Sequence, residues 1–155
     1  IVTISSNRST HYYSDEVMNE QASALGKAVY KAIVKSGKKV VMVASHSMSH
    51  RHFVTESPLP EDMSKEHIYN HSQYVWDMKV IEMMREGRME EVIGILPEMI
   101  EQTMAEAEGG GLTWMMAAMG MPDYPAEIYG YQSVIGTGNV IAAWDPNESS
   151  RAIVL

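Results

Sequence analysis

Three histidines gather in one short segment of the chain, and their side chains are suited to acid–base or metal chemistry. His46, His50 and His52 fall within seven residues, directly after the apolar run 40–43. If this run is a buried strand, the histidines occupy the loop at its carboxyl end, where open parallel sheets place their ligands. Imidazole titrates near neutral pH and binds metal ions, so the segment predicts an active-site loop.

The residues alone allow three interpretations of this loop. His46 and His50 are four residues apart, a spacing that puts two imidazoles on one face of a helix and occurs in zinc sites. The segment follows a predicted strand, however, and contains Ser45, Ser47 and Ser49 but no cysteine or nearby acid to complete a tetrahedral set. A self-contained zinc site is therefore the least favoured interpretation. Hydrogen-bonded loop histidines, or one catalytic histidine with two supporting ones, remain.

Two carboxylates further along the chain are also candidates for a site. Glu106 and Glu108 lie where a predicted helix gives way to Gly109–Gly111. Glycines permit the close backbone approach and unusual dihedral angles that can turn a carboxylate inward, although an acidic run is usually a solvated helix face.

A second pair of histidines, His67 and His71, is also four residues apart. This spacing is typical of a helix start with packed aromatics but also suits a pocket wall.

The first part of the chain predicts the elements that position the histidine loop. Residues 1–5 have the composition of a strand, and Ser14 followed by two acids is typical of a helix start. Apolar residues then recur at helical spacing until Gly37 ends the helix, and residues 39–44 are the next predicted strand. Strand, helix and strand in this order predict a βαβ unit with a parallel pair, and hence an α/β fold.

The rest of the chain predicts helices packed on this sheet and a hairpin near the carboxyl end. Helical spacing recurs over residues 72–87, over residues 89–106 with an interruption or a new start at Pro97, and over residues 112–119. The β-rich runs 127–135 and 140–144 flank the predicted turn Gly136–Asn139, which lacks the Gly-Lys-Ser/Thr of a phosphate loop. We therefore predict a βαβ core with a mostly parallel sheet, a C-terminal β-hairpin, and helices packed on the sheet.

The composition narrows the class of protein. A chain of 155 residues with 45% hydrophobic and 21% charged residues fits one folded domain. The net charge of -8 and the lack of a basic block argue against nucleic acid as a partner. With no cysteine, no membrane-spanning run and no signal-peptide pattern, we expect a cytoplasmic protein. The 14 methionines favour core packing or a subunit interface.

Taken in order, the motifs resemble one enzyme family. Ser47-Met48-Ser49-His50 is similar to the Gly/Ser-Leu-Ser-His element of the class III extradiol ring-cleaving dioxygenases, the protocatechuate 4,5-dioxygenase superfamily. The helix from Trp76-Asp77 to Gly87 resembles that family's helix before its Leu-x-x-Gly stop, and residues 106–120 resemble the segment with its iron-binding glutamate. The resemblance covers nearly the whole chain, and within the family it is strongest to the catalytic subunits that cleave 2-aminophenol.

The resemblance implies an enzyme whose Fe(II) is held by two histidines and one carboxylate, with positions left open for the aromatic substrate and O2. Carried over by motif, His50 is the histidine that removes a substrate proton and later returns one, and Glu106 is the iron carboxylate. Glu108 is the fallback, because the glycines make an alignment slip of two residues easy. His46 and His52 are candidates for supporting the site or lining the substrate pocket.

The implied reaction is ring cleavage of 2-aminophenol or a related catechol in aromatic degradation. The family's two iron histidines have no counterpart here and are expected upstream of Ile1, so we expect residues 1–155 to be the C-terminal part of a single domain. A homologous non-catalytic subunit is the expected partner. Two alternatives stay open: the chain belongs to such a non-catalytic subunit, against which the retained His50 and Glu106 argue, or it is an α/β ligand-binding module without redox activity.

Overall fold

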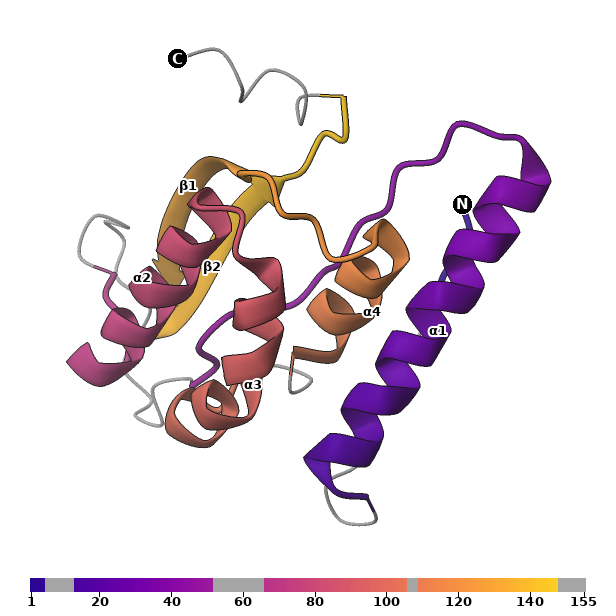
Figure 1. Ribbon diagram of the computed structural model, residues 1–155. Coiled ribbons are helices and arrows are strands. Elements are labelled where there is room, and N and C mark those ends of the chain that lie inside the picture. Colours follow the sequence, from indigo (N-terminus) through magenta and orange to yellow (C-terminus); the bar gives the residue numbers. More distant parts are fainter. Residues whose placement is uncertain (5–12, 52–65, 106–108, 148–155) are drawn as a thin grey trace. The chain divides into compact units, whose positions relative to one another are not determined.

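The computed structural model of the protein describes residues 1–4, 13–51, 66–105 and 109–147 (Figure 1). In these ranges the elements are, in chain order, α1 (Asp15–Ser36), α2 (His71–Arg85), α3 (Met89–Thr103), α4 (Gly110–Met119), β1 (Glu127–Val134) and β2 (Thr137–Ala143). The chain divides into two compact units, Ile1–His46 with Ala107–Met121, and Ser47–Glu106 with Pro122–Leu155. The first unit therefore holds α1 and α4, and the second holds α2, α3 and the hairpin.

Helix α1 has the boundaries that its sequence predicts. The Ser14 side chain accepts a hydrogen bond from the Val17 backbone N–H at 3.4 Å, which satisfies one of the free donors at the start of the helix. Gly37 ends the helix in the left-handed conformation, with a φ of 62°, and its N–H bonds to the Val34 carbonyl. Local capping chemistry thus fixes both ends of this helix.

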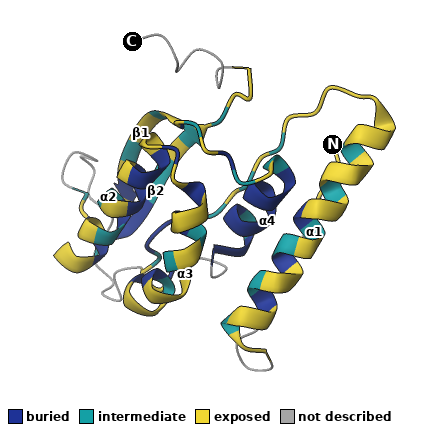
Figure 2. Ribbon diagram, in the orientation of Figure 1, coloured by how far each residue is buried: buried dark blue, intermediate teal, exposed yellow. Residues whose placement is uncertain are grey.

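The first unit is built by packing α1 against α4. Met18, Ala22 and Gly26 of α1 are buried at intervals of one turn, while α4 is buried along almost its whole length (Figure 2). Gly26 allows the two helices to approach closely. A Cβ atom at this position would lie 2.7 Å from the Ala117 Cβ, 2.9 Å from the Ala118 N, and closer still to the Trp114 carbonyl oxygen.

We expect Gly26→Ala to destabilise the protein. The added methyl group would overlap backbone atoms of α4. Overpacking typically costs about 1–3 kcal/mol, and overlap with rigid backbone belongs at the upper end of that range, above the roughly 1 kcal/mol that alanine gains over glycine inside a helix. Gly94→Ala in α3 is the matched control, since nothing lies within 4 Å of the added Cβ there. Urea unfolding should therefore show a loss for Gly26→Ala and no loss for Gly94→Ala. Equal stability of the two variants would refute the close helix contact.

The prediction of a parallel βαβ unit is wrong for the described residues. Residues 1–4 and 38–46 form no strand, and the sheet of the described residues has only the two antiparallel strands β1 and β2. A strand needs a neighbour for its backbone hydrogen bonds, and neither segment has one among these residues. Val40, Val41 and Val43 accordingly remain exposed. The chain is mixed α and β, but its described part has no parallel sheet.

In the second unit, α2 packs against α3 and against both strands. The buried face of α2 consists of Gln73, Asp77, Val80, Ile81, Met83 and Met84, and that of α3 of Met89, Val92, Leu96, Met99 and Thr103.

Helix α3 continues through Pro97, so the predicted interruption is wrong. Pro97 lies on the exposed side, where the loss of one hydrogen bond is tolerated while the apolar face stays packed.

The predicted hairpin is present, but its turn lies earlier than expected. Ile135 and Gly136 have φ values of 53° and 86°, the positive pair required by a two-residue type I′ turn. Thr137 is therefore already paired with Val134, and Gly138 is a strand residue rather than a turn residue. The turn thus places Gly138 on β2, where its backbone bonds to the histidine loop.

None of the described helices is both long and apolar enough to cross a membrane.

Candidate active-site loop

The backbone leading to His50 is held by hydrogen bonds to two separate elements. The Met48 N–H donates to the Gly138 carbonyl of β2 at 2.9 Å, and the Ser49 carbonyl accepts from the Gly138 N–H at 3.0 Å. The His50 N–H donates to the carbonyl of Thr103, the last residue of α3, at 3.1 Å. The peptide between Ser49 and His50 is therefore bonded through both its carbonyl and its N–H, which fixes where the His50 side chain begins.

A buried carboxylate completes this arrangement. Asp77 of α2 is fully buried and accepts three hydrogen bonds, from the Ser49 N–H at 3.0 Å, the Ser49 hydroxyl at 2.7 Å and the Tyr131 hydroxyl at 2.6 Å. Asp77, Ser49 and Tyr131 thus form a hydrogen-bonded cluster, and Gly138 lies directly against it. A Cβ there would be 2.7 Å from the Tyr131 Oη, 2.9 Å from the Ser49 Oγ, and in overlap with the Asp77 Oδ2. Glycine at this position therefore makes room for the carboxylate.

The ionisation of the cluster is dominated by burial. Burial raises the pKa of Asp77 above its ordinary value, while the hydrogen bonds from Tyr131 and Ser49 act in the opposite direction. Burial and the neighbouring Asp77 also raise the pKa of Tyr131 well above its usual range, so its hydroxyl stays neutral and remains a donor. The raised pKa of Asp77 makes protein stability depend on pH.

We expect Asp77→Asn to remove that dependence. The folded state keeps the Asp77 proton at pH values where the unfolded chain has lost it. The contribution of Asp77 to the free energy of unfolding therefore falls as pH rises from 3.8 through the raised pKa and is constant above it. Asparagine cannot ionise. The stability of the Asp77→Asn variant relative to the wild type should therefore increase across that range and then level off. Urea denaturation at several pH values measures this difference, and a decrease with rising pH would contradict the raised pKa.

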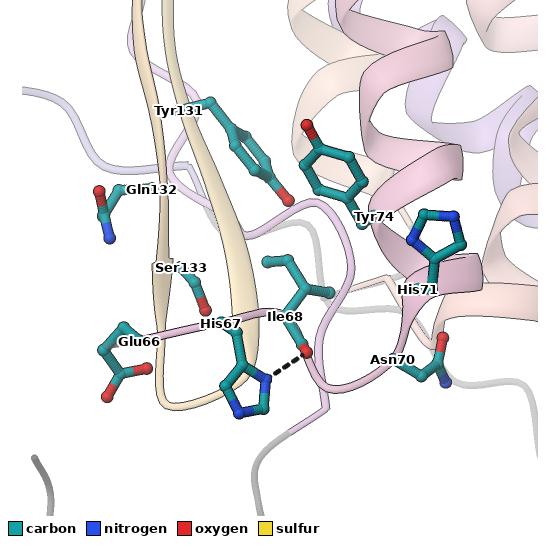
Figure 3. Close-up of a pocket in the computed structure, with 9 residues that line it drawn as sticks. All are labelled: Glu66, His67, Ile68, Asn70, His71, Tyr74, Tyr131, Gln132 and Ser133. Atoms are coloured by element: carbon teal, nitrogen blue, oxygen red, sulfur yellow. Dashed lines mark hydrogen bonds between the residues drawn. The ribbon is translucent and has the colours of Figure 1, made fainter. Parts of the chain in front are cut away.

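A pocket of about 440 Å³ opens beside the cluster (Figure 3). Its lining consists of Glu66, His67, Ile68, Asn70, His71, Tyr74, Tyr131, Gln132 and Ser133. The rings of Tyr74 and Tyr131 face each other edge to face, with centroids 6.2 Å apart. The Ser133 hydroxyl is buried and has no hydrogen-bond partner among the described residues. Tyr131 connects the pocket to Asp77, because it lines the pocket and its hydroxyl donates to the Asp77 carboxylate.

The structure locates some of the predicted site residues. His50 is half-buried at the end of the clamped loop in the second unit, and His46 is half-buried in the first unit, where it lies next to Gly111. The prediction of a helix start with packed aromatics is confirmed, because α2 begins at His71 and its ring stacks on that of Tyr74. His67 and His71 also line the pocket, and the His67 Nδ1 lies 2.9 Å from the Ile68 carbonyl oxygen.

The other predicted residues, His52, Glu106 and Glu108, lie outside the described residues. Within the described part of the chain, no three histidine, cysteine or acidic side chains are grouped so that they could hold a metal ion. The roles of His50, Glu106 and Glu108 therefore remain predictions.

Asp77 was not among the predicted site residues, although its position in the helix is a signal that could have found it. Asp77 lies four residues after Gln73 and three before Val80, so it shares the buried face of α2. A carboxylate on an apolar helix face is costly unless it is hydrogen-bonded. Its presence there predicts donors nearby. Tyr131 could not be identified as one of them, because it lies 54 residues further along the chain.

Comparisons with known proteins identify one family and, as relatives, two proteins named as dioxygenases. The family described as the catalytic LigB subunit of aromatic ring-opening dioxygenase matches residues 11–143. The 2-aminophenol 1,6-dioxygenase β subunit of Pseudomonas sp. is 50% identical over 145 residues, which is 94% of this chain and 48% of that protein. The 3,4-dihydroxyphenylacetate 2,3-dioxygenase of Escherichia coli is 26% identical over 129 residues, 83% of this chain and 44% of that protein. The chain spans about half the length of the curated relatives it matches.

Proposed function

Because the chain belongs to the family of the catalytic LigB subunit of aromatic ring-opening dioxygenases, we propose that the protein it forms part of opens an aromatic ring with O2. The observation that carries the proposal is the 50% identity, over 94% of the chain, to the β subunit of 2-aminophenol 1,6-dioxygenase. The proposed substrate is 2-aminophenol or a related catechol, and the setting is aromatic degradation in the cytoplasm.

His50 is the proposed acid–base residue. It follows Ser47-Met48-Ser49 in the family's histidine motif, and its peptide is hydrogen-bonded on both sides. A group that takes a proton from a substrate hydroxyl and later returns it must be held within hydrogen-bond reach of that hydroxyl. A half-buried histidine whose backbone is hydrogen-bonded on both sides suits this need, because its side chain starts from a fixed position and the residue is still partly exposed. His46 and His52 are the proposed supporting histidines.

Glu106 is the proposed protein ligand of Fe(II) in this chain, with Glu108 as fallback and two histidines supplied from outside residues 1–155. One carboxylate and two imidazoles are a donor set that suits Fe(II) and leaves positions open. Thr103, whose carbonyl accepts from the His50 N–H, precedes Glu106 by three residues in the sequence. This backbone contact between His50 and Thr103 supports the proposal that both residues serve one site. Fe(II), when bound there, would supply open coordination positions for the aromatic substrate and O2.

We further propose that these residues are the C-terminal part of a single extradiol-dioxygenase domain. The exposed valines Val40, Val41 and Val43 support this, because a run of β-branched residues is typical of a strand in a larger sheet. The name of the 50% identical relative, a β subunit, supports pairing with a second kind of subunit. The proposed assembly is a hetero-oligomer with a homologous, non-catalytic partner.

The proposed function is tested with the full-length protein, purified without O2 together with its partner subunit and loaded with Fe(II). Oxygen uptake is measured with 2-aminophenol, catechol and 3,4-dihydroxyphenylacetate, each with and without an iron chelator. The expected result is rapid uptake with at least one of these compounds, abolished by the chelator. If the protein retains no iron after loading and takes up no O2 with any of the three compounds, the result would instead favour the non-catalytic subunit or the ligand-binding module.

A further inference from the structure

We propose that Asp77 is a positioning residue whose carboxylate, through Ser49, sets the place of the His50 imidazole in the site. The inference rests on the proposed function, because it assigns Asp77 to the same acid–base step. It adds a residue that lies on another element and does not itself touch the substrate. Three observations carry it: the bonding of the loop, the burial of the carboxylate and the space that Gly138 leaves for it.

The loop before His50 is bonded at three consecutive N–H groups. Those of Met48 and His50 donate to backbone carbonyls, of Gly138 and Thr103, whereas that of Ser49 donates to the Asp77 carboxylate. Asp77 is therefore the one side chain among these three acceptors. The Ser49 hydroxyl also donates to it at 2.7 Å, so the carboxylate holds both the backbone and the side chain of the residue before His50.

Packing alone gives no reason for a carboxylate at this position. Asp77 lies on the buried face of α2, where desolvation disfavours a charge. Three hydrogen bonds satisfy it, including the one from Tyr131 at 2.6 Å. An apolar residue of similar size would pack without that cost but would leave the Ser49 N–H without its acceptor. The carboxylate thus serves to hold the loop.

The absence of a side chain at Gly138 gives independent support. Gly138 lies in β2 with paired backbone neighbours, a place where glycine weakens a strand and often marks the close approach of another group. The group that approaches here is the Asp77 carboxylate, with which any Cβ would overlap. The same glycine also bonds to Met48 and Ser49 through its backbone. The backbone of Gly138, the Thr103 carbonyl and the Asp77 carboxylate therefore hold the loop together.

The first experiment compares Asp77→Ala and Asp77→Asn in the full-length, iron-loaded protein. Asp77→Ala removes all three bonds, and a misplacement of about 1 Å at a reacting group can cost about 100-fold in rate. We expect kcat to fall by about 30- to 100-fold, with KM and iron content nearly unchanged. Asp77→Asn keeps the three contacts, because its carbonyl accepts from the Ser49 N–H and its NH2 donates to the Ser49 and Tyr131 hydroxyls. We expect this variant to recover kcat to within a few-fold of wild type.

Other outcomes would overturn the inference. An unchanged kcat in Asp77→Ala would show that the carboxylate does not position the base, and an Asp77→Asn variant as slow as Asp77→Ala would show that the charge, not the hydrogen bonding, is needed. If Asp77→Ala does not fold, Ser49→Ala decides instead, since it removes only the hydroxyl bond. A kcat about 3- to 10-fold lower at constant KM supports positioning. An unchanged kcat in this variant together with an unchanged kcat in Gly138→Ala refutes it.

Gly138→Ala approaches the same cluster from the strand. Its methyl group would displace the Asp77 carboxylate, so kcat should fall as in Asp77→Ala while the residues of the loop stay intact. Gly94→Ala makes the same chemical change where nothing lies within 4 Å, and it should leave kcat unchanged. Wild-type kcat in a folded Gly138→Ala variant would contradict the proposed role of the cluster.

A measurement that does not depend on turnover separates this inference from the proposed function. The ring signals of His50 are recorded by NMR in iron-free protein labelled with ¹⁵N. We expect them to shift and broaden in Asp77→Ala but to coincide with wild type in Asp77→Asn and Gly94→Ala. If no aromatic compound is turned over, the proposed function fails while this result still supports positioning. Identical His50 signals in Asp77→Ala and wild type would overturn the inference even in an active enzyme.

Discussion

Glu106→Ala is expected to leave the full-length protein almost without iron. A carboxylate brings negative charge to the metal, whereas two neutral imidazoles compensate the charge of Fe(II) poorly. Removing a supporting group outside the ligand set already costs roughly 10- to 100-fold in metal affinity, so the loss of the anionic ligand itself should exceed that range. The measurement is the iron-to-protein ratio after anaerobic purification, determined by a colorimetric chelator.

Glu108→Ala is the matched control for Glu106→Ala. Both glutamates precede the glycines 109–111, and the variants remove the same carboxylate two residues apart. Glu108→Ala should retain the iron content of the wild type. The opposite pattern, iron lost in Glu108→Ala and kept in Glu106→Ala, would move the ligand to the fallback position. Full iron content in both variants would refute a carboxylate ligand in this segment.

His50→Gln is expected to lower turnover by about 100-fold or more while the protein keeps its iron. General acid–base catalysis contributes roughly 100- to 10,000-fold, and glutamine can form hydrogen bonds but cannot accept and return a proton near neutral pH. Because His50 is proposed to stay free of the metal, its loss should leave the binding of Fe(II) intact. The measurements are kcat and iron content on the same preparation.

The control for His50→Gln is Lys35→Gln, which introduces the same side chain at an exposed position of α1 that neither lines the pocket nor belongs to the family motif. Lys35→Gln should keep kcat within a few-fold of wild type. Wild-type turnover in His50→Gln would end the acid–base assignment. Loss of iron together with activity would instead make His50 a metal ligand.

Helix boundaries could be predicted from the sequence where local chemistry decides them. Ser14 and Gly37 delimit α1 because capping depends on residues within one turn. The predicted strand 39–44 failed because a strand is defined by its partner, which the residues of the segment do not specify. The interruption predicted at Pro97 was wrong for a related reason. Packing of the buried face of α3, which depends on the fold, outweighs the cost of one proline in the helix.

The candidate site shows the same division. The loop carrying His50 is a candidate on its motif alone, because the residues of the motif are contiguous, and its role remains a prediction. The contacts that hold it could not be identified, since Asp77 and Tyr131 are 54 residues apart and meet only through the fold. The turn was placed two residues too late because Gly138 was interpreted as a turn glycine. Its actual role is to admit the Asp77 carboxylate, a tertiary reason that leaves no local signal.

The most direct test of the central claim, that this chain belongs to a ring-opening dioxygenase, is to follow both atoms of O2 into the product. The full-length protein is supplied with ¹⁸O2 and 2-aminophenol, and the product is reduced with borohydride at once, before its aldehyde oxygen exchanges with water. Mass spectrometry should then find two ¹⁸O atoms in a ring-opened product, one in the new carboxylate and one in the reduced aldehyde. A ring-intact product, or one with a single ¹⁸O atom, would contradict the claim.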